Sequence, residues 1–399
     1  MHMPTSPLEA TTHHDPYPYY AELARQDRLV RDDAFGGWIA ASANVVESVL
    51  AHEACRVRPV DQPVPDSLLG SRAGKLYGDM ARMRDDADHA PIKQAISAAL
   101  GALHETSTLR RIQNCADRLL VDAKDRTPER VTEYAFRLPI LVMAELLGLA
   151  AEQHQAVAEW GHAFARCIAP GSSETQQQAG KQAAENLYVT LQARLGLPIK
   201  EEGLLMRLAD QTHRRGFEDR EALMANAIGL LLQTYEATAG LIGNTLVALG
   251  RSPQACERAD SSTRHLEATI REVLRHDPPI HNTRRFVAHD TKIAGQTLHA
   301  GEVILVVLAA ANHDATRFPD PGHFDPQRAR QACYTFGTGR HACPGETLAV
   351  TIAEIGVRRL LATGLEPVTL LENMAYQHSQ NARLPLFASP TPTNKEPNP

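Results

Sequence analysis

The 399-residue sequence contains no apolar run near the roughly 20 residues that span a bilayer, and its start lacks a signal-peptide pattern. Basic residues are not in excess, because 41 Lys and Arg face 47 Asp and Glu, a formal net charge of -6. This balance gives no positive field that would attract nucleic acid. The six cysteines lack the spacing of a disulfide framework, which fits a reducing compartment. We therefore expect a cytoplasmic protein that binds neither membrane nor nucleic acid.

No linker rich in proline, glycine or serine divides the chain, and no block of like charge does so. A chain of this length can bury a large core. We expect one large domain over residues 16–389, a flexible start at residues 1–15 and a disordered tail at residues 390–399.

Hydrophobic spacing predicts a mainly α-helical protein with a small β part. Helical periodicity dominates residues 89–250, and the largely apolar stretch 225–249 predicts a long buried helix. Residues 57–75 are rich in proline, glycine and charge and predict a long loop. Shorter elements are expected as helices at 17–25 and 43–51, as strands at 29–30, 38–40, 285–288 and 301–305, and as an irregular segment at 312–328.

The most informative stretch is residues 336–349, FGTGRHACPGETLA. It places a glycine loop, two basic side chains and one cysteine directly before an apolar run that is helical in character. Glycines let a backbone approach a flat ligand, and a thiolate at a helix N-terminus is stabilised by the dipole and free amides. Arg340 and His341 suit the carboxylates of such a ligand.

This stretch resembles the haem-binding signature of the cytochrome P-450 superfamily, in which the cysteine is the axial iron ligand. The resemblance implies that Cys343 ligates the iron of haem b, that Phe336 and Gly337 belong to the haem-binding loop, and that His341 holds a propionate. The alternative is a buried structural cysteine beside a turn. Because every fixed position of the ten-residue pattern is present in order, the haem site is favoured.

Two further motifs follow the order of that family. Glu272 and Arg275 form an acid–base pair at i,i+3, and the nearby run at 283–285 ends in Arg285. By resemblance the pair locks onto an arginine of the meander at 318–328, and Arg285 reaches a propionate. The alternative for the meander is an ordinary surface loop.

The third motif is DHAPIK at residues 88–93. The resemblance implies that His89 and Lys93, on one helix face, hold a propionate. Lys93 stands where arginine is usual, which keeps the charge but loses the bidentate fork. Plain helix surface is the alternative. With the opening at residues 15–39, typical of soluble bacterial members, the resemblance spans essentially the whole chain.

The oxygen-activating helix departs from the family pattern Ala/Gly-Gly-x-Asp/Glu-Thr-Thr. Residues 233–238 read QTYEAT, so the acid is kept as Glu236, whereas Ala237 replaces the usual hydroxyl and Thr234 the usual glycine. Gln233 and Ala237 share a helix face, as do Thr234 and Thr238.

Three interpretations of this departure stay open. The first is sequence drift without a change of function, in which Thr234 bonds back to a carbonyl of the preceding turn and Gln233 packs along the haem edge. Altered proton delivery is the second, with Glu236 in the relay and Thr234, Gln233 or a substrate group as donor. The third is a reaction other than simple hydroxylation. Pro344 is also unusual, because it removes an amide that would point toward the thiolate.

The resemblance implies oxidation of a small organic substrate, of the kind found in secondary metabolism, with dioxygen and two electrons. A separate ferredoxin or flavodoxin would supply the electrons, since no flavin or iron–sulfur domain is fused. We expect five arginines to border the face that receives this partner: Arg82, Arg84, Arg328, Arg330 and Arg340.

The alternative activities are a peroxygenase, a coupling or desaturation catalyst, or a dehydratase. A non-catalytic haem-binding partner or gas sensor is less favoured because Cys343 is present. Residues 57–85 and 164–195 should line the substrate pocket by family analogy, and the polar side chains of the second region suggest a polar or carrier-protein-tethered ligand.

Overall fold

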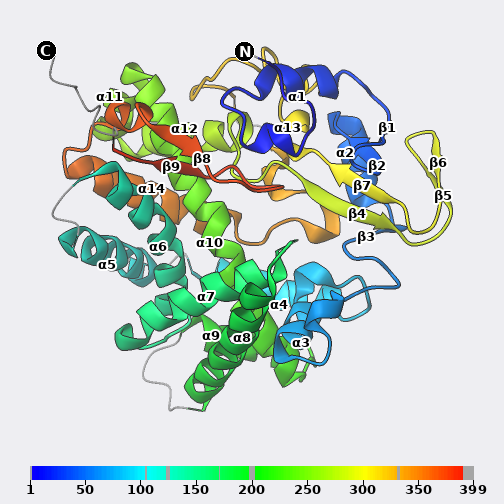
Figure 1. The fold of residues 1–399 in the computed structure, drawn as a ribbon. Coiled ribbons are helices and arrows are strands. Elements are labelled where there is room, and N and C mark those ends of the chain that lie inside the picture. Colours follow the sequence, from blue (N-terminus) through cyan, green and yellow to red (C-terminus); the bar gives the residue numbers. More distant parts are fainter. Residues whose placement is uncertain are drawn as a thin grey trace, which may run out of the picture.

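The computed structural model describes residues 2–103, 106–122, 126–169, 171–196, 203–329 and 333–389. Helices make up most of these residues, and a small sheet lies at one side of them (Figure 1). The predicted fold class is therefore confirmed. Within the described ranges, no helix has both the length and the apolar character needed to cross a membrane. The predicted tail and Arg330 lie outside the described residues.

The helical part is organised around α10 (Arg220–Arg251), which runs through its centre (Figure 1). The other helices are α1 (Tyr17–Ala24), α2 (Ala43–Ala51), α3 (Arg72–Asp79), α4 (His89–Gly101), α5 (Thr106–Asp122), α6 (Pro128–Leu146), α7 (His154–Ile168), α8 (Glu174–Leu195), α9 (Leu204–His213), α11 (Pro253–Ser261), α12 (Thr263–His276), α13 (Leu308–Ala311) and α14 (Glu346–Ala362).

The long buried helix predicted at 225–249 is confirmed, although it begins earlier, at Arg220. Asp219 fixes that start, because its carboxylate accepts hydrogen bonds from the amides of Glu221 and Ala222 at 2.9 and 3.1 Å. Helices α3, α6 and α14 pack around α10. The consequence is a helix in which 24 of 32 residues are buried.

The main sheet joins distant parts of the chain. Its order is β1 (Val30–Asp32), β2 (Gly37–Ala40), β7 (Val303–Val306), β4 (Thr283–Val287) and β3 (Cys55–Arg56). The β2–β7 pair is parallel, with Trp38 opposite Ile304, and the other pairs are antiparallel. Two small hairpins complete the β structure: β5 (Thr291–Ile293) with β6 (Gln296–Leu298), and β8 (Met374–Tyr376) with β9 (Pro385–Phe387).

The loop predicted over residues 57–75 is partly wrong, because α3 begins inside it at Arg72. Ser71 starts this helix by accepting a hydrogen bond from the Gly74 amide at 3.2 Å. A short 3-10 helix, η2 (Asp66–Leu68), also lies in this segment. Composition alone missed both; in α3, two glycines and three charged residues mask the short apolar face.

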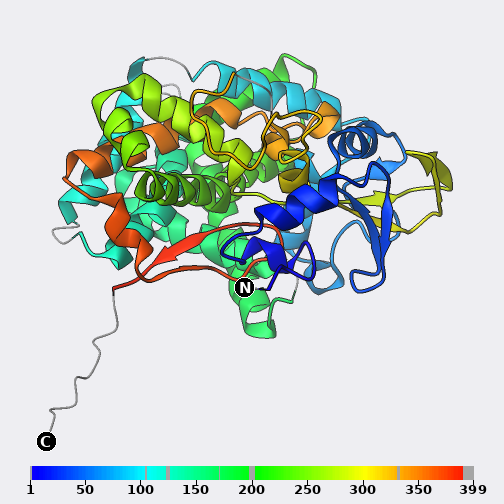
Figure 2. The ribbon, with the colours of Figure 1, turned by 90° about the horizontal axis from the view of Figure 1, so that it is seen from above.

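The start of the chain packs beside the C-terminal hairpin (Figure 2). Arg383 is fully buried and donates to the carboxylate of Asp277 at 2.7 Å. The same guanidinium donates to the carbonyl oxygens of Thr11, His13 and His14. These bonds hold the end of the segment for which the sequence predicts flexibility; the domain limits themselves stay predictions.

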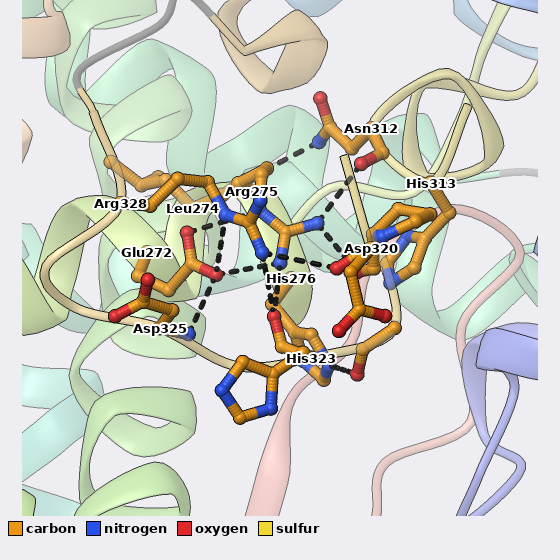
Figure 3. A network of polar contacts seen from close by, with 12 residues as sticks. Glu272, Leu274, Arg275, His276, Asn312, His313, Asp320, His323, Asp325 and Arg328 are labelled. Carbon is orange, nitrogen blue, oxygen red and sulfur yellow. Dashed lines mark hydrogen bonds and ion pairs between the residues drawn. The ribbon is translucent and has the colours of Figure 1, made fainter. Parts of the chain in front are cut away.

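A buried ion-pair network joins α12 to the irregular segment that follows α13 (Figure 3). Arg275 donates through Nε and one terminal nitrogen to Glu272 at 3.0 and 2.6 Å. Arg328 and the Asp325 amide also donate to Glu272, at 3.4 and 3.0 Å. The expected lock between the helix pair and the meander arginine is confirmed. Arg275 makes further bonds to the carbonyl oxygens of Asn312, Pro321 and His323.

We expect Glu272→Gln to lower the free energy of unfolding by about 3–5 kcal/mol, because the change leaves Arg275 as a buried charge without its partner. The matched control is Glu267→Gln on the same helix, where the Glu267 side chain is 46% exposed and pairs with Arg271. That change should cost less than about 1 kcal/mol. Urea unfolding followed by circular dichroism measures both, and equal losses would contradict the role given to the network.

Candidate functional site

The loop that carries Cys343 is closed by backbone geometry. Gly337 and Gly339 have φ values of 66° and 69°, in the left-handed region that favours glycine. The Cys343 amide donates to the Phe336 carbonyl oxygen at 2.8 Å, which folds the loop back on itself. Helix α14 begins at Glu346, directly after the loop. The cysteine is thus held at the start of a helix, as the sequence predicts.

The Cys343 sulfur faces accessible space inside the protein. Of the six cysteines, all of which lie in the described residues, Cys343 alone is exposed. Burial nevertheless raises the pKa of its thiol, while a hydrogen bond from the Gly345 amide, at 3.3 Å, and the charge of Lys93 act in the opposite direction. Exposure and desolvation coexist where a side chain faces an enclosed hollow rather than bulk solvent. The Gly345 amide also supplies the sulfur with one donor in spite of Pro344.

A second set of accessible side chains interrupts the buried surface of α10. Gln233 is exposed, and Thr234, Glu236 and Ala237 are half-buried, whereas Thr238 is buried. Residues 81–93 connect this part of α10 to the cysteine loop, because the Ala81 amide donates to Asn226 of α10 and Lys93 donates to the Ala342 carbonyl oxygen. The side chains of Cys343, Gln233 and Arg82 are each exposed; we infer that they face one space, which we call the interior hollow.

Side-chain bonding on α10 differs from one expectation. Gln233, not Thr234, bonds back to its own helix, with its amide nitrogen 2.9 Å from the Gly229 carbonyl oxygen. No hydrogen bond of the Thr234 hydroxyl is found within the described ranges. The back-bond that the first interpretation assigns to Thr234 is therefore not found there. The Thr234 hydroxyl remains available to a ligand.

Glu236 is the acidic group of this set. Burial raises the pKa of its carboxyl, and the positive charges of Arg166 and Arg82 act against that rise. Its neighbour Tyr235 points elsewhere, since its hydroxyl lies 3.1 Å from Nδ1 of His162 on α7. Glu236 can therefore hold or release a proton inside the protein, where water has limited access.

His89 and Arg285 are buried basic side chains without an acidic partner among the residues that the structure places. Nε2 of His89 has no hydrogen-bond partner there, and burial together with nearby positive charge lowers its pKa to about 4. Arg285 donates only to the Thr283 hydroxyl at 3.4 Å and the Arg284 carbonyl oxygen at 2.8 Å. Such groups require an acceptor, which a carboxylate-bearing cofactor would supply.

His341 and Lys93 have partners within the protein. The His341 ring lies with its centroid 4.5 Å from that of His89, and its Nε2 lies 3.0 Å from Asp85. Burial would raise the pKa of Asp85, but hydrogen bonds from His341 and the Val57 amide outweigh it and lower the pKa to about 2. Sequence reasoning missed Asp85, since no local pattern indicates contact with a residue 256 positions away.

The arginines expected to receive a redox partner are mostly engaged. Arg328 belongs to the Glu272 network, Arg340 bonds Asp85, and Arg84 bonds Asp86 and Asp88. Arg82 differs from these arginines, because within the described ranges it makes no hydrogen bond or ion pair and its charge acts on Glu236 of α10; its place on the partner face stays a prediction.

The sequence and the fold both match known proteins. A family model described as Cytochrome P-450 matches residues 208–363. Cytochrome P-450 107B1 of Saccharopolyspora erythraea is 30% identical over 279 residues, which cover 69% of this chain and 68% of that protein. The monooxygenase PikC of Streptomyces venezuelae is 29% identical over 360 residues, covering 87% of this chain and 83% of PikC.

Solved structures agree with these matches. The crystal structure of CalO2 superposes with a TM-score of 0.80 at 25% identity, covering 94% of this chain and 96% of CalO2. The epothilone B-bound cytochrome P-450epoK gives a TM-score of 0.81 at 23% identity, covering 97% and 100%, and supports the fold. The chain therefore belongs to the cytochrome P-450 family, and it is a haem b oxidoreductase of the monooxygenase class.

Proposed function

We propose that Cys343 ligates the haem iron and that the enzyme oxidises a small organic substrate of secondary metabolism. The observation that carries this proposal is the Cys343 sulfur, which faces the interior hollow at the start of α14 and accepts a hydrogen bond from Gly345. Dioxygen is one substrate, and a separate ferredoxin or flavodoxin supplies two electrons. When bound, haem supplies oxygen activation and redox chemistry.

The basic side chains around the hollow suit the two haem propionates. His89 on α4 and Arg285 on β4 have donors to offer and no acidic partner in the described chain. Lys93 and His341 would join them by exchanging their bonds to Ala342 and Asp85 for bonds to a propionate. Phe336 and Gly337 shape the loop that would hold the haem. A chain with these unpaired groups fits a flat dicarboxylate cofactor.

The first variant test concerns the ligand itself. We expect Cys343→Ala to lose the strongly red-shifted Soret band that the reduced, carbon monoxide-treated protein shows when a thiolate ligates iron. Cys333→Ala is the matched control, because Cys333 is half-buried at the start of the same loop segment and should keep the band. Loss of the band in the Cys333 variant alone would contradict the assignment.

Proton delivery would then use Glu236 and a hydroxyl other than that of the threonine that Ala237 replaces. Ala237 has no hydroxyl, and the Gln233 amide is occupied by the Gly229 carbonyl oxygen. Thr234 has a hydroxyl without a partner in the described part of the chain and lies in the helical turn that contains Glu236. Thr238 is buried behind it. Thr234 is therefore the protein donor that the geometry favours, ahead of Gln233 and Thr238.

We expect Thr234→Ala to divert electrons to hydrogen peroxide and to lower product formation by about 10²–10⁴-fold, the usual contribution of a general acid. Gln233→Ala is the control and should change coupling little, since its amide is already bonded. Peroxide formed per reduced nicotinamide consumed measures coupling. A large gain in coupling from Ala237→Thr, with no loss from Thr234→Ala, would show instead that the helix is a degraded form of the usual one.

Ala237 also keeps a second candidate function open. Without the usual hydroxyl, the same site suits a peroxygenase or a catalyst of coupling, desaturation or dehydration. Turnover driven by hydrogen peroxide but not by a reductase system would favour the peroxygenase over the monooxygenase, and the identity of the product separates coupling, desaturation and dehydration from hydroxylation. A substrate tethered to a carrier protein also stays a prediction.

A further inference from the structure

The segment that carries Arg82 is fixed against the central helix. The Ala81 amide donates to the side-chain oxygen of Asn226 on α10 at 2.8 Å, and the Asn226 amide nitrogen donates to the Asp79 carbonyl oxygen at 3.1 Å. Met80 and Ala81 are buried in the main core. The 3-10 turn η3 (Ala81–Met83) therefore holds the backbone of Arg82 in one place beside α10.

The Arg82 side chain extends into the interior hollow. It is exposed, yet burial lowers the pKa of its guanidinium, as for a group that faces enclosed space. Within the described ranges it makes no hydrogen bond or ion pair. Nearby arginines are all engaged: Arg56 bonds the Asp85 carbonyl oxygen, Arg72 bonds Glu221, and Arg84 bonds Asp86 and Asp88. Among the described residues, Arg82 and Arg166 are thus the arginines near Glu236 that make no hydrogen bond or ion pair, and Arg82 is the one whose backbone is fixed against α10.

The charges around Arg82 do not balance. Glu236 of α10 is the carboxylate that acts on it, and Tyr77 of α3 is the other group. Arg166 of α7 acts on the same Glu236 from a third element. Two positive charges thus act on one carboxyl group. Burial raises the pKa of that group, which favours its neutral form. An enclosed cation without a counter-charge is costly, and one organic anion would remove the imbalance.

We propose that Arg82 binds a carboxylate of the substrate, so that the enzyme takes an organic acid. The planar guanidinium matches a carboxylate with two parallel hydrogen bonds. Its place beside Glu236 puts the charged end of the substrate near the helix that carries Thr234 and Ala237. This inference rests on the proposed function, since it takes the hollow beside α10 as the substrate side. The competing role for Arg82 is only to neutralise Glu236, in which case substrate charge would not matter.

The experiment uses the haem-loaded protein and imidazoles that carry straight alkanoic-acid tails of stepped length, each compared with its primary amide. The imidazole nitrogen ligates iron in both series and shifts the Soret band, so the pair differs only at the tail end. At one tail length we expect the acid to bind at least about tenfold more tightly, in line with the strength of charged hydrogen bonds. Arg82→Gln should abolish that preference, and Arg82→Lys should keep part of it.

Arg25→Gln is the matched control, because the Arg25 side chain is 76% exposed in a surface pair with Glu22; it should leave the preference unchanged. Equal binding of acid and amide at every tail length in the unmodified protein would overturn the inference without any variant. A preference that survives Arg82→Gln would overturn it as well. Absence of a Soret shift with both series would refute the haem-thiolate site itself, and the inference with it.

Discussion

The buried pair of Glu272 and Arg275 is the constraint on which the site depends. Arg275 donates to the carbonyl oxygen of Asn312, and the Asn312 side chain bonds both the Tyr334 amide, at 2.7 Å, and the Thr335 hydroxyl, at 2.9 Å. The Cys343 loop begins immediately after these two residues. The Glu272–Arg275 pair on α12, which lies far from Cys343 in the sequence, thus fixes where the loop starts. This positioning of the loop explains why the fold keeps a buried ion pair in spite of its desolvation penalty.

The interior collects more positive than negative side chains, and this excess explains what the fold is built to hold. Lys93 acts on Cys343 and on His89, and Asp85 acts on both His89 and Arg285. Arg82 and Arg166 act on Glu236. Cations enclosed in this way are stable only with anions beside them. The propionates of haem would supply the negative charge that the first group needs. The second group is the basis for the proposal that Arg82 binds the substrate.

Local patterns were sufficient to predict much of this architecture. The apolar run of α10, the glycine loop around Cys343 and the spacing of Glu272 and Arg275 each lie within a short stretch of sequence, so the fold class could be predicted, and the lock to Arg328 was implied by the family resemblance that these motifs carry. Contacts between distant segments did not. Asp85 meets His341, and Arg82 turns to Glu236, through packing that no periodicity encodes. Nor did the sequence predict that Gln233 bonds the Gly229 carbonyl oxygen of its own helix.

The claim that most of this account rests on is that the Cys343 sulfur ligates the haem iron. Iron-edge X-ray absorption of the purified ferric protein tests it directly, because sulfur scatters differently from nitrogen and oxygen and lies farther from the metal. We predict one sulfur atom in the first coordination shell of the unmodified protein, lost in Cys343→Ala and kept in Cys333→Ala. A first shell of nitrogen and oxygen only, in protein with full haem content, would contradict the claim.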